Sequence, residues 1–169
     1  MTGIRLEPLG EPHLPAVEEM LEDPDVLRFT RVPVPVPDGF ARAWVQRYED
    51  GRADGTREGF AIVDESGAFL GLALAPHIDR EAREVELGYL VAPSARGRGV
   101  ATAALRLLTD WAFASLDAFR LALLISPANA ASKKVAERAG YTYEGTLRGT
   151  WFKQGLREDT EVWSRLATD

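Results

Sequence analysis

The chain has 169 residues, of which 46% are hydrophobic and 27% charged, a composition typical of one globular domain with a substantial core. Its formal net charge of −6 argues against nucleic acid as the main partner, because nucleic-acid binding usually requires a basic face. The absence of cysteine excludes disulfides, cysteine-ligated zinc and a cysteine acyl-enzyme.

Neither a metal site nor a membrane anchor is predicted. The two histidines, His13 and His77, are far apart and lack the spacing of metal ligands. No apolar run approaches the roughly 18 residues of a membrane span, and the N-terminus lacks a signal-peptide core. We therefore expect a cytoplasmic protein, and the preference for arginine over lysine, 17 of 20 basic residues, suggests a bacterial genome of high GC content.

The N-terminal half alternates strand and helix patterns. Apolar and charged residues alternate over residues 4–7, which predicts a strand, and apolar residues recur at helical spacing over residues 11–22. Three alternating prolines in "FTRVPVPVPDGF" predict an extended loop, after which Asp38 is a candidate N-cap for a second helix. Two strands follow as a hairpin, residues 60–63 and 69–75, around a Glu-Ser-Gly turn.

The C-terminal half continues the mixed pattern. A strand over residues 83–91 leads through a glycine-rich corner into a helix over residues 99–115, and "FRLALLIS" is typical of a strand in the middle of a covered sheet. A short helix spans residues 129–138, and the tail forms two strands around a turn at Gln154-Gly155. No linker or repeat interrupts the chain, so we expect one mixed α/β domain over residues 1–169.

The corner "APSARGRGVAT" raises the question of which group its two arginines hold. Glycines at a strand-helix junction can simply relieve backbone strain, with the arginines serving solubility. A dinucleotide site is disfavoured, because Thr102 stands where a third small residue is needed and the next strand ends in Ser126-Pro127 rather than in an acid. A third interpretation is a pyrophosphate site, in which free N–H groups at the helix start and the guanidiniums of Arg96 and Arg98 contact phosphate oxygens.

Longer stretches carry a specific resemblance. "VELGYLVAPSARGRGVATAALRLLTDWAF" resembles the acetyl-CoA-binding motif of the GNAT superfamily of N-acetyltransferases, with Arg96, Gly99 and Ala101 at the signature positions. "RLALLISPANAASKKVAERAGYTYEGTLR" is similar to the next strand and helix of that family, and "LRGTWFKQGLREDTEVWSRL" resembles its RimJ/RimL branch, which acetylates protein N-termini. Such a fold is a mostly antiparallel mixed sheet of about seven strands that splays between the fourth and fifth and is flanked by about four helices.

The resemblance implies where acetyl-CoA, the co-substrate, would bind. Backbone groups at the end of the fourth strand would bond the pantetheine and polarise the thioester, and the corner would wrap the pyrophosphate. Asn129 would contact the pantetheine from the other side, although its position also fits a plain helix N-cap. The cofactor residues implied are Leu90, Val91, Arg96, Gly97, Arg98, Gly99, Val100, Ala101, Thr102, Asn129 and Ser132.

Without a thiol nucleophile, the implied reaction is direct transfer to an amine. Glu86 is the candidate base, because a carboxylate in a partly dry cleft can have its pKa raised toward the working pH. The alternative for Glu86 is a solvated strand-face residue or an ion pair with Arg83. Many family members carry a tyrosine acid where this chain has Ala136, so Ser132 is the candidate replacement, unless it only caps its helix.

The acceptor side carries less information. We expect the proline loop to form its mouth, with Phe29 and Trp151 as walls and Trp44 in the core. Some members of the branch carry an acid in the C-terminal hairpin, whereas "GTWFKQG" has none. The predicted function is N-acetylation of a protein or peptide N-terminus, with a small-molecule amine or a catalytically silent acyl-CoA-binding module as alternatives. A homodimer would be compatible with the resemblance, and no nucleic acid, membrane or metal partner is expected.

Overall fold

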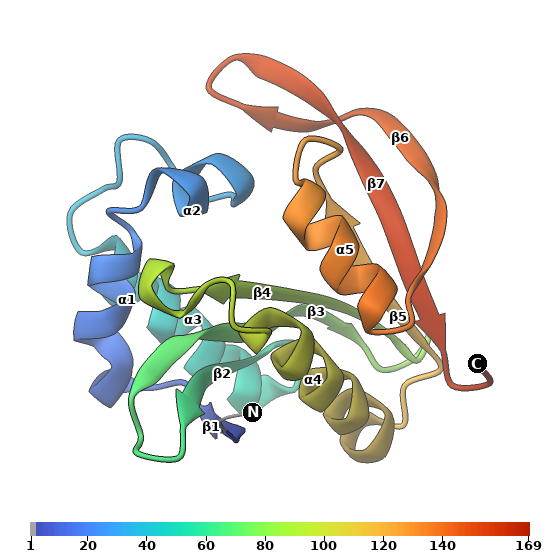
Figure 1. Ribbon diagram of the computed structural model, residues 1–169, viewed down its shortest axis with the longest axis horizontal. Coiled ribbons are helices and arrows are strands. Elements are labelled where there is room, and N and C mark those ends of the chain that lie inside the picture. Colours follow the sequence, from blue (N-terminus) through green and yellow to red (C-terminus); the bar gives the residue numbers. More distant parts are fainter. Residues whose placement is uncertain (1–2) are drawn as a thin grey trace.

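The computed structural model describes residues 3–169 and places one seven-stranded sheet through the molecule, in the order β1-β2-β3-β4-β5-β7-β6 (Figure 1). Neighbouring strands are antiparallel except for the parallel pair β4 and β5. The strands are β1 (Ile4–Pro8), β2 (Glu58–Asp64), β3 (Phe69–Asp79), β4 (Glu84–Val91), β5 (Arg120–Ile125), β6 (Thr142–Lys153) and β7 (Leu156–Leu166).

Five α-helices and two short 3₁₀ helices are found in the described residues. The α-helices are α1 (Leu14–Met20), α2 (Pro24–Phe29), α3 (Phe40–Asp54), α4 (Val100–Leu116) and α5 (Ala130–Arg138), and the 3₁₀ helices are η1 (Glu11–His13) and η2 (Pro93–Ala95). The helix α4 packs against β1, β3 and β4, and α3 packs on β2 and against α1 (Figure 1). None of these helices is long and apolar enough to cross a membrane.

The parallel pair β4 and β5 separates after three residue pairs. Glu84, Val85 and Glu86 pair with residues 120–122, and beyond that point the two strands diverge. On its other edge β4 stays paired with β3 as far as Val91, and β5 stays paired with β7 along its whole length. The wedge therefore opens at the carboxyl ends of β4 and β5, which confirms the predicted splay between the fourth and fifth strands.

The core lies between the sheet and its helices and explains the apolar patterns. Leu105 and Leu108 of α4 are fully buried, and Trp111 meets Phe60 of β2 edge-to-face at 5.1 Å between ring centroids. Thr109 of α4 is also buried, and its hydroxyl is hydrogen-bonded to the Tyr141 hydroxyl at 2.7 Å. A buried hydroxyl is tolerated when it has such a partner.

One local prediction was wrong and one helix was missed. The helix α3 begins after Gly39, which adopts the left-handed conformation (φ 73°), so Asp38 is not its N-cap. The helix α2 was not predicted, because its six residues are too few for helical periodicity to show. It begins at Pro24 behind Asp23, whose side chain accepts a hydrogen bond from the Asp25 N–H at 3.1 Å. The predicted domain, residues 1–169, includes two residues that lie outside the described part.

Candidate functional site

The glycine-rich corner opens α4 at the mouth of the wedge. Gly97 and Gly99 both have positive φ, 73° and 77°, and no atom lies within 4 Å of the position that a Cβ would occupy at either glycine. The open space beside them allows a ligand to approach the backbone closely, and the first N–H groups of a helix carry partial positive charge. Arg98 is exposed next to them, while Val100 is buried and anchors the first turn.

Arg96, the other arginine of the corner, is exposed but contacts other groups of the protein. Its guanidinium forms an ion pair with Asp23 and lies 3.5 Å from a carboxylate oxygen of Asp25, and its Nε donates to the Val91 carbonyl at 3.2 Å. The same arginine therefore contacts the end of β4 and the start of α2. Its predicted contact with a pyrophosphate stays a prediction.

A pair of hydroxyls joins β4 to α5. The Tyr89 Oη lies 2.7 Å from the Ser132 Oγ and 3.2 Å from the Ser132 carbonyl oxygen, to which it donates. Ser132 is fixed in turn, because its N–H donates to the Asn129 side chain at 3.1 Å and makes Asn129 the N-cap of α5. Burial raises the pKa of Tyr89 to about 12, so this phenol stays protonated at neutral pH. Tyr89 was missed from the sequence, because its strand position gave no sign that it reaches the next helix.

Glu86 lies on the opposite face of β4 from Tyr89, as the alternation of side chains along a strand requires. Burial raises the pKa of Glu86, although the positive charges of Arg31 and His77 oppose the shift. Glu86 and His77 are register partners on β4 and β3, and both line a cavity of about 330 Å³ whose other lining residues are Asp79, Glu84, Ala122 and Leu124. No ion pair of Glu86 with Arg83 is formed, because Arg83 contacts Asp117 instead, at 3.0 Å.

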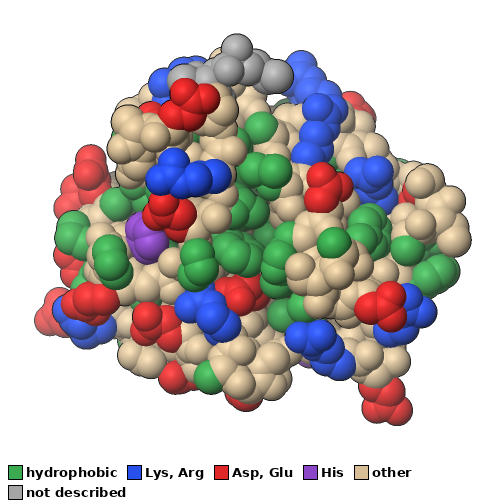
Figure 2. All heavy atoms as spheres, turned by 90° about the horizontal axis from the view of Figure 1, so that it is seen from below, with side chains coloured by type: hydrophobic (Ala, Val, Ile, Leu, Met, Phe, Trp, Pro, Cys, Tyr) green, Lys and Arg blue, Asp and Glu red, His purple; other side chains and the backbone are tan. Residues whose placement is uncertain are grey.

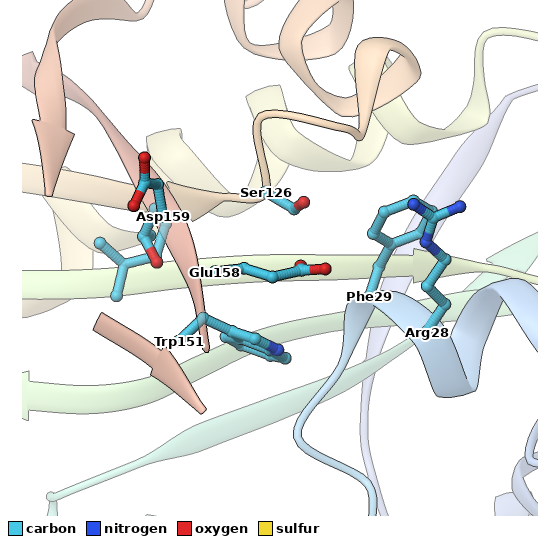
Figure 3. A pocket seen from close by; sticks show the side chains of 8 residues that line it. Arg28, Phe29, Ser126, Trp151, Glu158 and Asp159 are labelled. Atoms are coloured by element: carbon cyan, nitrogen blue, oxygen red, sulfur yellow. The ribbon is translucent and has the colours of Figure 1, made fainter. Parts of the chain in front are cut away.

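A second, smaller cavity of about 20 Å³ lies between α2 and the β6–β7 hairpin, with Leu124 lining both cavities. Phe29 and Trp151, the predicted acceptor walls, face it from opposite sides, and the Glu158 carboxylate points into the space between them (Figure 3). Glu158 is the register partner of Trp151 across the hairpin. An acid absent from "GTWFKQG" itself thus lies beside Trp151 on the neighbouring strand β7.

Arg31, the second residue after α2, acts on one lining residue of each cavity. Its guanidinium carbon lies 4.6 Å from the centroid of the Trp151 ring, a cation–π contact, and its positive charge partly opposes the rise that burial causes in the pKa of Glu86. Trp44, in contrast, packs against the core between Phe40 and Tyr48, as predicted.

Leu90 and Val91 are held against β3 by a close backbone approach. At Gly71, which pairs with Val91 and has φ 154°, a Cβ would lie 2.1 Å from the Leu90 carbonyl oxygen. Glycine is needed there because any side chain would push β4 into the wedge. The position of the two predicted cofactor residues thus depends on a residue that no motif marks.

The face shown in Figure 2 carries a mixed distribution of charge. On the face shown in Figure 2, basic and acidic side chains are interspersed and hydrophobic ones gather near the middle, with no basic stripe. Within residues 3–169, no group of three or more histidine, aspartate or glutamate side chains is arranged to hold a metal ion.

Comparison with known proteins gives consistent matches. The model of the acetyltransferase (GNAT) domain family matches residues 4–142. The "Putative ribosomal N-acetyltransferase YdaF" of Bacillus subtilis (strain 168) is 31% identical over 73% of this chain, and the spermidine N(1)-acetyltransferase of Escherichia coli (strain K12) is 28% identical over 56%. The matched stretches span 64% and 50%, respectively, of the lengths of those two relatives.

Solved structures share the whole fold. A spermidine N-acetyltransferase from Vibrio cholerae, in complex with CoA and spermine, superposes with a TM-score of 0.86 at 19% identity and covers 98% of this chain and 96% of its own. The ribosomal L7/L12 α-N-protein acetyltransferase RimL, in complex with coenzyme A, has a TM-score of 0.88 at 22% identity, covering 98% and 95%. Since the family model spans well over half of the residues, the chain belongs to the GNAT acetyltransferase family.

Proposed function

We propose that this protein transfers the acetyl group of acetyl-CoA to a primary amine, with the α-amine of a protein or peptide as the leading acceptor. The observation that supports this most is the wedge between β4 and β5, which opens beside the glycine start of α4. Acetyl-CoA has an extended thioester arm and a pyrophosphate. The unpaired strand edges of the wedge can bond the arm, and the N–H groups at the helix start can bind the phosphates.

The residues at the wedge fit a coenzyme A molecule. The backbone from Gly97 to Thr102 would contact the pyrophosphate, with Arg98 adding a charge-assisted contact. Backbone groups of Leu90 and Val91 would bond the pantetheine and, as donors near the thioester oxygen, stabilise the negative charge that develops during transfer. Asn129 contributes by capping α5 and fixing Ser132.

Acid and base functions lie on opposite faces of β4. Glu86 would take a proton from the incoming ammonium, directly or through water, and its raised pKa suits that task. On the other face, the Tyr89 and Ser132 hydroxyls would donate to the sulfur that leaves. A thiol with a pKa near 8.5 leaves without much assistance, so the alanine at position 136 is compatible with turnover.

The acceptor remains the open part of the proposal. An α-amine, with a pKa near 8, loses its proton more easily than a lysine amine near 10.4 and suits a carboxylate base. The match to a ribosomal N-acetyltransferase at 31% identity also favours a protein N-terminus. A polyamine is the second candidate, favoured by the cavity around Glu86, where Asp79 adds a further carboxylate that would attract a multiply charged cation; Glu84, which also lines it, is paired with Arg120 at 3.2 Å.

A thiol-release assay with paired acceptors tests the proposal. Each peptide is supplied with a free and with an N-acetylated terminus, alongside spermidine and a monoamine, with acetyl-CoA as donor. We expect steady thiol release with a free terminus and none with its blocked partner. Release with spermidine alone would favour the second candidate, and binding of acetyl-CoA without turnover of any amine would refute transferase activity. The cytoplasmic location and a homodimer stay predictions.

A further inference from the structure

The short helix α2 is held at both ends by cationic side chains from the two sides of the wedge. In Figure 1 it lies between the tip of the β6–β7 hairpin and the loop around η2. Arg96 follows η2 and contacts the N-terminal end of α2, while Lys153, the last residue of β6, contacts its C-terminal end. With six residues, α2 has few internal hydrogen bonds. Its Val26 side chain is buried in the core, and the contacts with Arg96 and Lys153 fix its two ends.

Arg96 contacts α2 through the carboxylate of Asp23. The Asp23 side chain is 11% exposed, so its carboxylate needs the paired guanidinium. The same carboxylate accepts from the Asp25 N–H and caps the helix. Because Arg96 also donates to the Val91 carbonyl, the end of β4 and the start of α2 are joined through one side chain.

Lys153 pairs with free carbonyl groups at the C-terminal end of α2. Its ammonium donates to the carbonyls of Leu27 and Thr30, the latter at 2.8 Å. These carbonyls belong to the last turn of α2 and the residue after it, which have no further helical N–H to pair with. A lysine at this position also interacts favourably with the helix dipole.

The place of α2 determines the shape of the smaller cavity. Arg28 and Phe29 line it from α2, and Trp151 and Glu158 line it from the hairpin (Figure 3). With about 20 Å³ of space, close to the size of one water molecule, this cavity would change substantially if α2 moved by about one ångström. Arg31, which lies over Trp151, follows the same helix and would move with it.

We propose that Arg96 and Lys153 are positioning residues that hold α2 as one wall of the acceptor site, so that Arg96 serves acceptor recognition through Asp23. This inference rests on the proposed acetyl transfer and concerns its acceptor side. Loss of either contact releases the same helix, which weakens acceptor binding and leaves donor binding intact.

The substitution Asp23→Asn isolates the ion pair. Asparagine caps a helix as well as aspartate does, so the hydrogen bond to the Asp25 N–H is kept while the charge facing Arg96 is lost. Lys153→Met keeps the unbranched stem and removes the ammonium. The matched control is Asp117→Asn, which removes the carboxylate partner of Arg83 at the far end of α4 and keeps a residue that tolerates its positive φ of 51°.

For each variant, the acceptor KM, the acetyl-CoA KM and kcat are measured, and acetyl-CoA binding is measured by calorimetry. We expect Asp23→Asn and Lys153→Met each to raise the acceptor KM about tenfold, equivalent to ~1.4 kcal/mol, with the acetyl-CoA Kd within about twofold of wild type. Because both contacts hold one helix, the double variant should fall well short of the roughly hundredfold rise that independent sites would give. Amide hydrogen exchange should accelerate in residues 25–30 of both variants.

Three results would overturn the inference: an acceptor KM that does not change in either variant, an acetyl-CoA Kd that changes while the acceptor KM does not, or a fully multiplicative double variant. The proposed function fails separately, because it requires wild-type turnover. Wild-type protein that releases no thiol with any peptide or spermidine refutes transfer, and the exchange experiment, which needs no turnover, then still decides whether the two contacts hold α2.

Discussion

Replacing Gly71 with alanine perturbs the wedge through the backbone of β3. The added Cβ would lie 2.1 Å from the Leu90 carbonyl oxygen and 3.0 Å from the Val91 Cα, both of which are backbone atoms that cannot rotate away. Since a carbon and an oxygen pack no closer than about 3.2 Å, β4 has to move by roughly 1 Å. That movement would displace the residues predicted to bond the pantetheine.

The cost has a backbone part and a packing part. Alanine at φ 154° is strained by roughly 1–3 kcal/mol, and overpacking adds about 1–3 kcal/mol. Gly145→Ala separates the two, because Gly145 has nearly the same φ, 155°, and no atom within 4 Å of its Cβ position. We therefore expect Gly71→Ala to be less stable than Gly145→Ala by about 2 kcal/mol, or ~4–8 °C in Tm for a chain of this length.

Activity should separate the two variants further. A misplacement of about 1 Å at a reacting centre can lower turnover about 100-fold, so we expect kcat/KM for acetyl-CoA to fall by about that factor in Gly71→Ala and to stay near wild type in Gly145→Ala. Urea unfolding and thiol-release kinetics on both proteins provide the measurement. If Gly71→Ala and Gly145→Ala lose equal stability, and Gly71→Ala keeps wild-type kinetics, then the close packing of β3 against Leu90 and Val91 does not hold the site in place.

Three further predictions test other contacts. Glu86→Gln should lower kcat about 100-fold and abolish the acidic limb of the pH–rate profile, which in wild type reflects protonation of Glu86 at its raised pKa; an unchanged profile would exclude Glu86 as base. Thr109→Val should cost about 1–3 kcal/mol in urea unfolding by leaving the buried Tyr141 hydroxyl unpaired, and Tyr141→Phe in the same protein should recover much of it. Hydrogen bonds from Arg120 lower the pKa of the half-exposed Glu144 to about 2, so the small stabilisation lost in Glu144→Gln, under about 1 kcal/mol, should be present above pH 4.5 and vanish as pH falls toward 2.

The fold could be predicted where a pattern extends over a whole element. The predicted strand over residues 83–91 corresponds to β4, in which Glu86 alternates with the buried Val85 and Leu87, and the continuous apolar run of β5 placed that strand inside the sheet. Short elements lacked this signal. The six residues of α2 are defined by a cap at Asp23 and by contacts with Arg96 and Lys153, none of which is visible as periodicity.

In the candidate site, too, residues in one continuous stretch could be named from the sequence, whereas contacts between distant residues could not. Candidate donor residues could be named from the sequence because they lie in one continuous stretch, where glycines, arginines and the helix start occur in a fixed order; their contacts with the donor stay predictions. Tyr89 and Ser132 lie 43 residues apart and meet only through the packing of α5 beside β4, so their contact could not be read from spacing. The structure likewise engages Arg96 with Asp23, 73 residues away, although its motif position suggests phosphate.

The acceptor side combines segments that no common motif links. Phe29 is the last residue of α2. Trp151, Lys153 and Glu158 belong to the hairpin, which lies beyond residue 142, where the family match ends. A family whose shared part builds the wedge can keep one donor and vary the acceptor by changing this hairpin and the helix that it holds. The cross-strand pairing of Trp151 with Glu158 and the contact of Lys153 with α2 place aromatic, acidic and basic groups around one small cavity. In the acceptor site that we propose, the choice of acceptor depends on how closely α2 and the hairpin approach each other, a distance that the contacts of Arg96 with Asp23 and of Lys153 with α2 would set.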